Sequence, residues 1–252
     1  MSGHSKWKTI QHKKNAMDAK RGKIFSKLSK ELSVVAKKGG SNPDTNPALR
    51  TVIQKAKSVN MPAENIERAI KKGAGELGGV VYEEVSYEAY GAGGVGIVVN
   101  ALTDNKNRTA AEVRHIFTRH GRDFASVGSV MRGFQRKGQI ILDAKGLNED
   151  KIMELVLEAG AEDMTKDEDR IEIITDPTAF PAVCEALEKA GIKPISAEIS
   201  LLPITTVPVT DKKTAEEILR LVNDLEDNDD VQNVFTNMEM SDELMTEMAK
   251  ES

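Results

Sequence analysis

The chain has 252 residues, 39% of them hydrophobic, and a formal net charge of −5 at pH 7. This length and composition can bury a core and predict two or three domains. Its single cysteine, Cys184, excludes an internal disulfide framework and is typical of a reducing compartment. The sequence has no apolar run of the roughly eighteen residues that a membrane span needs, and its start lacks a signal-peptide core. We therefore expect a cytoplasmic protein with no membrane partner.

The charges of the chain are strongly polarised. Residues 1–40 carry eleven Lys or Arg and two acids, a net charge of +9, whereas residues 210–252 carry thirteen acids and four bases. A cationic segment on an acidic protein favours a polyanionic partner, because binding releases the counterions condensed on that partner. Nucleic acid is the first hypothesis for the partner.

Apolar spacing predicts three helices in the first 76 residues. Residues 1–14 show no such spacing, and Trp7 is their only large anchor. A helix is predicted over residues 16–38, with an apolar face and a flanking stripe of lysines. That stripe consists of Lys20, Lys23, Lys27, Lys30 and Lys37. Asn46-Pro47 predicts the start of a second helix, and Pro62 that of a third, which ends at Gly73.

The pattern then changes to alternating strands and helices. Strands are predicted over residues 82–90 and 96–102, followed by a helix that a Thr109/Glu112 capping box begins. The next elements have the order β-α-β-β-α-β of a ferredoxin-like unit. They are a strand at 139–142, a helix at 149–159, strands at 161–165 and 170–175, a helix from Asp176-Pro177 to Gly191, and a strand at 197–202.

The last part of the chain supplies elements that the sheet of residues 80–130 lacks. These are a strand at 205–209, a helix capped by Thr214 with Glu217, and a strand at 231–235. We therefore predict an α+β, multidomain protein, in which an N-terminal three-helix domain precedes two ferredoxin-like α/β domains, one inserted in the other. The predicted parts are 1–76, 77–134 plus 204–240, the insertion 135–203, and an acidic C-terminal tail at 241–252.

No motif in the sequence predicts catalysis. The glycines of 91–96 match G-x-G-x-x-G, but the strand-like Ile97-Val98-Val99 follows them, so a hairpin turn is favoured over a dinucleotide site. The four histidines lack zinc spacing, and Cys184 is expected to be a core thiol. We expect no enzymatic activity, no cofactor, no metal and no small-molecule substrate.

Several motifs resemble the YebC/PmpR family. They are Gly3-His4-Ser5-Lys6-Trp7, the segments 18–25, 60–70, 87–91, 102–109 and 112–115, and Asp230-Val231-Gln232-Asn233-Val234. The resemblance covers nearly the whole chain and implies a three-domain, non-enzymatic regulator. Bacterial members are described as DNA-binding transcriptional regulators, and others act in translation on the ribosome. At residues 121–125, Arg122, Asp123 and Phe124 replace the family's usual glycine-rich run.

The candidate nucleic-acid contacts lie in the basic start and on the helix that follows the hairpin. They are Lys6, Trp7, Lys8, His12, Lys13, Lys14, Lys20, Arg21, Lys23, Lys27, Lys30, Arg108, Arg114 and Arg119. Lysine outnumbers arginine in the arm, which favours phosphate contact over base readout. Arg108 near a helix N-terminus predicts a phosphate seat, with surface ion pairing as the alternative. Trp7 either stacks on a base or packs on the bundle.

The sequence leaves the target and one rival function open. Duplex DNA and ribosomal RNA, and with the latter the ribosome, are both compatible partners. The rival is a protein–protein adaptor that works through its acidic surface. In that case neutralising Asp227, Asp229 and Asp230 should abolish partner binding. The pattern around Asp229-Asp230 predicts solvated loop carboxylates.

Overall fold

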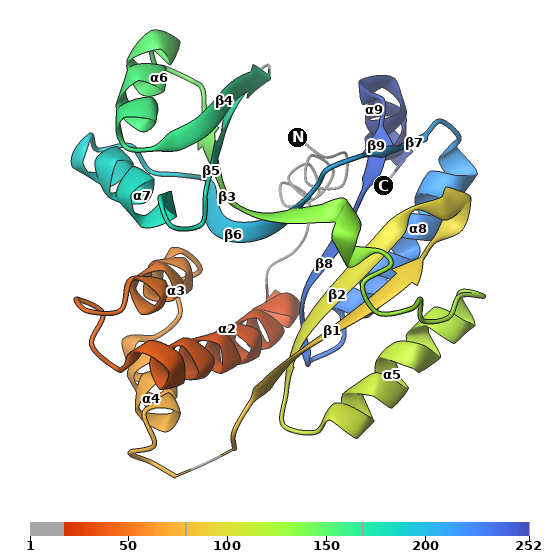
Figure 1. Ribbon diagram of the computed structural model, residues 1–252, viewed down its shortest axis with the longest axis horizontal. Coiled ribbons are helices and arrows are strands. Elements are labelled where there is room, and N and C mark those ends of the chain that lie inside the picture. Colours follow the sequence, from red (N-terminus) through yellow and green to blue (C-terminus); the bar gives the residue numbers. More distant parts are fainter. Residues whose placement is uncertain (1–17, 79, 168, 252) are drawn as a thin grey trace. The chain divides into compact units, whose positions relative to one another are not determined.

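The computed structural model describes residues 18–78, 80–167 and 169–251 (Figure 1). Residues 134–204 form one compact unit, and the described residues up to Gly133, together with those from Thr205 onward, form the other. The helices and strands confirm the predicted α+β class. No helix among the described residues is long and apolar enough to cross a membrane.

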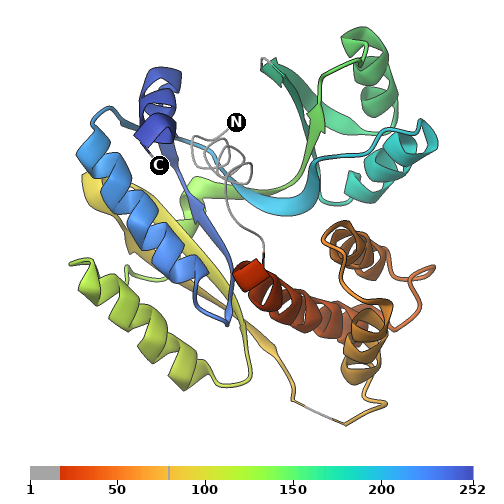
Figure 2. The same cartoon turned by 180° about the vertical axis from the view of Figure 1, so that it is seen from behind.

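Three helices make up the start of the described chain, and Figure 2 shows them from behind. They are α2 (Asp18–Gly39), α3 (Pro47–Ser58) and α4 (Ala63–Gly73). Asn46 caps α3 as predicted, because its side chain accepts a hydrogen bond from the backbone N–H of Leu49. The helices enclose a core of their own around Leu32 and Leu49, both fully buried.

Strands β1 (Glu83–Tyr90) and β2 (Gly96–Thr103) form an antiparallel hairpin. The glycine motif is its turn, as predicted, and Gly93 and Gly94 adopt positive φ there. Strand β8 (Val231–Thr236) pairs with β2, which completes a three-stranded sheet from two distant parts of the chain. Helices α5 (Lys106–Arg119) and α8 (Lys212–Glu226) pack against this sheet and share its hydrophobic core. Two short strands, β7 (Val207–Val209) and β9 (Met238–Met240), pair in parallel beside it.

The unit of residues 134–204 has a four-stranded antiparallel sheet in the order β4-β5-β3-β6. Its elements are β3 (Phe134–Asp143), α6 (Glu149–Glu158), β4 (Ala161–Asp167), β5 (Arg170–Thr175), α7 (Phe180–Lys189) and β6 (Ser196–Pro203). This is the strand order of the predicted ferredoxin-like unit. Helices α6 and α7 pack against the sheet and share one hydrophobic core with it. Burial against that core raises the pKa of the Cys184 thiol to about 11.

Three predicted helix starts were wrong. Helices α5 and α8 begin earlier than predicted, because Asn105 and Asp211 cap them by accepting hydrogen bonds from the backbone N–H groups of Arg108 and Thr214. Asn and Asp reach these N–H groups as well as Thr does, so the earlier residue takes the capping position. Helix α7 begins later than predicted, at Phe180, because Asp176 accepts the N–H of Thr178 in a turn that precedes the helix.

The C-terminal segment also differs from the predicted acidic tail. It forms helix α9 (Asp242–Glu251), and Leu244, Met245 and Met248 belong to the core of the α8 sheet. Because these apolar residues recur at helical spacing, the acidic side chains between them take the solvent side.

Close packing of two helices can be tested at Gly73, where a Cβ would collide with the backbone carbonyl of Ser33 on α2. We expect Gly73→Ala to lower the free energy of unfolding by about 1–3 kcal/mol, because backbone atoms cannot yield as a side chain can. Gly22→Ala is the matched control, since nothing lies within 4 Å of its added Cβ. It should raise stability by about 0.5–1 kcal/mol through helix propensity. Urea unfolding followed by circular dichroism measures both, and an equal effect of the two changes would contradict the packing.

Candidate nucleic-acid interface

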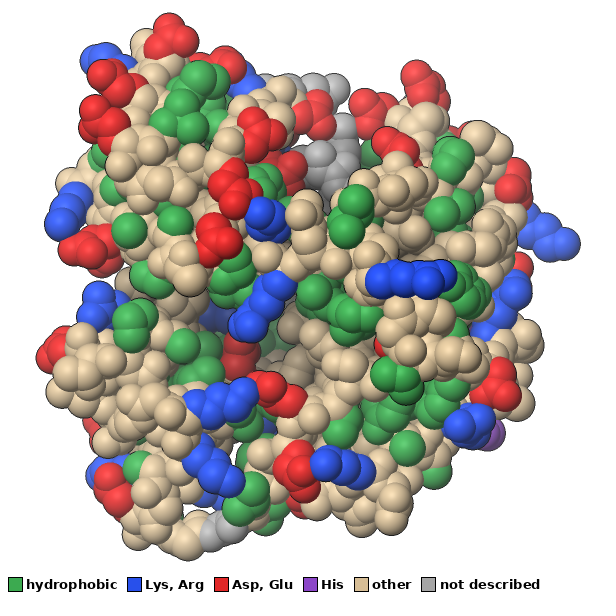
Figure 3. All heavy atoms as spheres, viewed as in Figure 1, with side chains coloured by type: hydrophobic (Ala, Val, Ile, Leu, Met, Phe, Trp, Pro, Cys, Tyr) green, Lys and Arg blue, Asp and Glu red, His purple; other side chains and the backbone are tan. Residues whose placement is uncertain are grey.

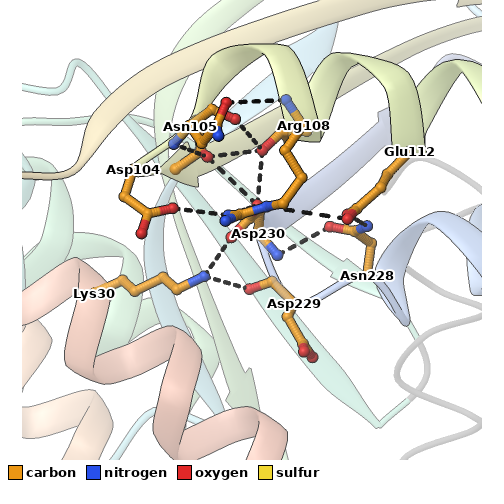
Figure 4. Close-up of polar contacts among 10 residues, drawn as sticks. Lys30, Asp104, Asn105, Arg108, Glu112, Asn228, Asp229 and Asp230 are labelled. Carbon is orange, nitrogen blue, oxygen red and sulfur yellow. Dashed lines mark hydrogen bonds and ion pairs between the residues drawn. The ribbon is translucent and has the colours of Figure 1, made fainter. Parts of the chain in front are cut away.

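One buried carboxylate organises the polar centre of the larger unit. Asp230, directly before β8, is 5% exposed and accepts hydrogen bonds from several elements (Figure 4). Its Oδ2 accepts from Arg108 Nη2 at 2.7 Å, from Thr109 Oγ1 at 2.7 Å and from Thr103 Oγ1 at 3.4 Å. Its Oδ1 accepts from Lys30 Nζ at 2.6 Å. The predicted solvated loop position of Asp230 was therefore wrong.

The backbone brings these groups together at the end of a strand pair. The N–H of Leu102 donates to the carbonyl of Asp230, which fixes the end of β2 against the start of β8. Thr103 ends β2, and α5 begins three residues later with Arg108 and Thr109 in its first turn. Strand pairing therefore sets the carboxylate directly against the N-terminus of the helix, where negative charge is stabilised.

The donors hold Asp230 in its charged form. Burial alone would raise its pKa, but the hydrogen bonds from Arg108, Lys30 and Thr109 outweigh burial and lower the pKa to about 2. The pKa of Arg108 is raised in turn by the hydrogen bonds from its guanidinium to Asp230 and Asp104. The predicted phosphate seat beside Arg108 is thus filled by a carboxylate of the same chain.

Three lysines of the predicted α2 stripe contact the segment 226–230. Lys23 Nζ donates to the carbonyl and carboxylate of Asp227, at 3.1 and 3.3 Å. Lys27 Nζ donates to the carbonyl of Glu226 at 2.6 Å, and Lys30 Nζ to the carbonyl of Asp229 at 2.8 Å. Burial lowers the pKa of Lys27, the largest influence on that group. These three lysines, predicted to point outward, make contacts inside the unit.

An open hollow of about 520 Å³ lies beside these contacts. Its lining residues include Lys23 and Lys30 of α2, Arg108 and Glu112 of α5, and residues 227–230. The ring of Tyr82 also lines the hollow, with the ammonium groups of Lys30 and Lys72 at 5.8 and 5.6 Å from its centroid. The hollow therefore presents cations and carboxylates together and suits a polar or charged group.

The other predicted arginines of α5 also have carboxylate partners. Arg114 Nη1 donates to Asp123 at 2.8 Å, and its guanidinium lies 4.4 Å from the ring centroid of Phe124. Arg119 pairs with Asp224, which His120 also contacts. The three predicted α5 residues thus lie on one helix, and each is neutralised by an acid.

The altered segment 121–125 is fixed by its own side chains. Phe124 stacks on Tyr87 with 5.2 Å between the ring centroids, and Arg122 pairs with Glu217 at 3.2 Å. The next loop is held by Glu88, whose carboxylate accepts the backbone N–H groups of Gly128, Val130 and Met131. A glycine run would supply neither the aromatic stack nor the ion pair, so this chain holds the loop in place with side chains.

The remaining candidate residues fall into two groups. Arg21 lies on α2 and is exposed. The structure does not describe the others, which lie in residues 1–17, nor the side chain of Lys20. The undescribed candidates are Lys6, Trp7, Lys8, His12, Lys13 and Lys14. Lys37 of the predicted stripe is exposed, and so are Lys57, Arg68 and Lys71 of the helical domain, which the sequence interpretation had not selected.

Sequence reasoning also missed Asp230 as the centre of the site. A signal was present, because a carboxylate directly before an apolar strand and a Thr at the end of another strand can meet across a sheet. The missing information was the register of β2 against β8, because this pairing brings together residues that are more than a hundred positions apart in the sequence.

The three-helix domain and the two α/β parts define a multidomain α+β protein, with a charged centre at Asp230 in the larger unit. Residues 5–76 match the family described as TACO1/YebC protein N-terminal domain, and residues 82–238 match TACO1/YebC second and third domain. The chain belongs to the TACO1/YebC family, as the sequence resemblance predicted.

Full-length relatives and a solved structure agree with this assignment. A probable transcriptional regulatory protein of Geobacter sulfurreducens is 54% identical over 248 residues, covering 98% of this chain and all of the relative. One of Desulfotalea psychrophila is 51% identical over 250 residues, covering 99% of this chain and all of the relative. The crystal structure of the conserved hypothetical protein Aq1575 from Aquifex aeolicus is 49% identical, with a TM-score of 0.82 over 90% of this chain and 93% of that one.

The role of Asp230 predicts a specific loss of stability on its neutralisation. We expect Asp230→Asn to lower the free energy of unfolding at pH 7 by about 1–3 kcal/mol, because an amide cannot satisfy the four donors. A carboxyl with a folded pKa of about 2 and an unfolded value of 3.8 stabilises the fold above pH 3.8. That contribution is lost as the pH falls toward 2. Between pH 3.8 and 2 the free energy of unfolding of the wild type should therefore fall through protonation of Asp230. Asp230→Asn lacks this contribution at every pH, so its stability should change less over the same range.

Asp229→Asn is the matched control, because its exposed side chain makes none of these hydrogen bonds. Urea titrations at a series of pH values measure both variants. Equal stability of Asp230→Asn and Asp229→Asn would contradict the central role of the Asp230 carboxylate.

Proposed function

We propose that this protein is a non-enzymatic regulator of gene expression that binds nucleic acid through its basic N-terminal part. The observation that carries the proposal is the net charge of +9 in residues 1–40 on a chain whose total is −5. Such a concentration of ammonium groups favours the phosphate backbone of a nucleic acid. The names of the relatives, probable transcriptional regulatory proteins, support duplex DNA as the target.

Exposed cations on the helical domain add to this support. Helix α3 contains no acidic residue, and Lys57 near its end is exposed. Arg68 and Lys71 are exposed on one side of α4, three residues apart. Elsewhere basic and acidic side chains alternate over the face drawn in Figure 3, which is unfavourable for a polyanion.

The perturbed carboxyls support a non-enzymatic role. Hydrogen bonds to backbone N–H groups lower the pKa of Glu88 against the opposing effect of burial, and hydrogen bonds with Thr214 and Thr178 lower those of Asp211 and Asp176. Contacts with His120 and Arg119 lower the pKa of Asp224. Each of these groups fixes a loop, a cap or an ion pair, which is a structural use of a shifted pKa.

The adaptor hypothesis receives less support. It needs the carboxylates of the acidic loop to be available to another protein. Asp230 is buried among four donors, and Asp227 contacts Lys23. An acidic working surface would therefore rest on Asp229 and on acids outside this loop.

Salt titrations of nucleic-acid binding test the proposal. We expect Lys6, Lys8, Lys13 and Lys14 replaced together by Ala to weaken binding to all sequences alike. On duplex DNA the slope of log K against log salt should flatten by about 3 to 4, since each phosphate contact contributes about 0.9. The measurement is fluorescence anisotropy with a labelled DNA duplex and with a labelled RNA hairpin, which compares the two targets.

A control variant has the same change in total charge. Lys145, Lys151, Lys189 and Lys193 are exposed in the unit of residues 134–204, and their replacement by Ala should leave the slope nearly unchanged. Equal slopes for the two quadruple variants would overturn the assignment to the N-terminal arm. Undetectable binding of the wild type at low salt would overturn the proposed function itself.

A further inference from the structure

Three lysines of the predicted α2 stripe donate to oxygens of one short segment. Lys23, Lys27 and Lys30 are spaced by four and three residues, so they project from one face of the helix. Their acceptors come from residues 226, 227, 229 and 230, which are the last residue of α8 and the loop that leads to β8. Three ammonium groups on one helix are thus matched by one short segment of the chain.

That segment offers the same chemistry as a phosphate backbone. The carbonyl of Glu226 lies at the C-terminus of α8, where the helix dipole adds negative partial charge. Asp227 and Asp230 supply carboxylate oxygens at 3.3 and 2.6 Å from the ammonium nitrogens. Charged oxygens of carboxylates and phosphates compete for the same lysine donors.

The contact can separate without exposing either hydrophobic core. The helical domain and the α8 sheet have separate buried clusters among the described residues. When Lys30 leaves, Asp230 keeps its hydrogen bonds from Arg108, Thr109 and Thr103. Residues 74–82 connect the helical domain to β1 of the α8 sheet, and Gly75 and Gly78 in this connection adopt positive φ.

We propose that the segment Glu226–Asp230 covers a phosphate-binding surface on α2, and that a nucleic-acid backbone displaces it to reach Lys23, Lys27 and Lys30. This inference rests on the proposed function and adds a closed state to it. The acidic end of the chain then raises the specificity of binding, because only a dense polyanion replaces three lysine contacts at once. DNA and RNA share the phosphate chemistry, and the test compares them.

Weakening the internal competitor should strengthen binding. In the full-length protein we expect Asp227→Asn with Asp229→Asn to raise affinity for a short DNA duplex about threefold to tenfold, because they remove the Lys23–Asp227 ion pair and a second negative charge near Lys27. Asp150→Asn with Glu154→Gln changes the total charge equally on exposed residues of α6 and is the control. An RNA hairpin of matched charge is titrated in parallel. An equal gain from both pairs would reduce the effect to total charge and overturn the competition.

The lysines themselves provide a second readout. With Lys23, Lys27 and Lys30 replaced by Ala, the salt slope on duplex DNA should fall by about 2 to 3 if these groups reach phosphates. If they only fix the helical domain in place, stability falls and the slope stays the same, which overturns the proposal. Thermal unfolding of the variant shows whether the fold is retained during the titration.

Fluorescence resonance energy transfer measures the displacement directly. Dyes at Ser41→Cys and Lys213→Cys, in a Cys184→Ser background, report the separation of the helical domain from α8. Transfer should fall when the DNA duplex or the RNA hairpin saturates the protein. Binding with unchanged transfer would overturn the displacement and leave the proposed function intact. Undetectable binding by both the wild type and the Asp227→Asn/Asp229→Asn variant would overturn both.

Discussion

The larger unit depends on compensating one buried charge. A carboxylate removed from water is costly unless several donors replace its hydration. Asp230 receives these donors from the end of β2, the first turn of α5 and the middle of α2. The requirement to satisfy this carboxylate therefore fixes a strand end, a helix start and a second helix in one arrangement (Figure 4).

The donors differ in how firmly they are held. Thr103 ends β2, which pairs with β8 directly after Asp230, and Arg108 and Thr109 begin α5 just beyond β2, whereas Lys30 comes from the helical domain. Burial lowers the pKa of the neighbouring Lys27, so its charged form is less favoured at this contact than in water. Ammonium–oxygen contacts of this kind weaken as ionic strength rises. The contact of α2 with residues 226–230 is therefore sensitive to salt and to competing anions, whereas apolar packing is not.

The sequence predicted the parts of this protein that depend on local periodicity. The helices other than α9, the hairpin at Gly91–Gly96 and the order of elements in residues 134–204 follow from spacings of about 3.6 and 2 residues. It failed where two neighbouring residues compete, as at Asn105 against Thr109 for the start of α5. It failed again at Asp230, whose partners are set by a strand register across the chain. The exposed lysine stripe was predicted from the helix alone, and helix periodicity carries no information about which element lies opposite.

The location of acids decides which cations remain available to a partner. On α5, the guanidinium groups of Arg108, Arg114 and Arg119 each meet a carboxylate, so that helix contributes little attraction for phosphate. Phe124 strengthens this by holding the guanidinium of Arg114 over its ring. On α3 and α4, by contrast, Lys57, Arg68 and Lys71 are exposed. The cationic surplus is therefore concentrated in the N-terminal part of the chain, and whether α2 adds to it depends on the segment that covers its lysines.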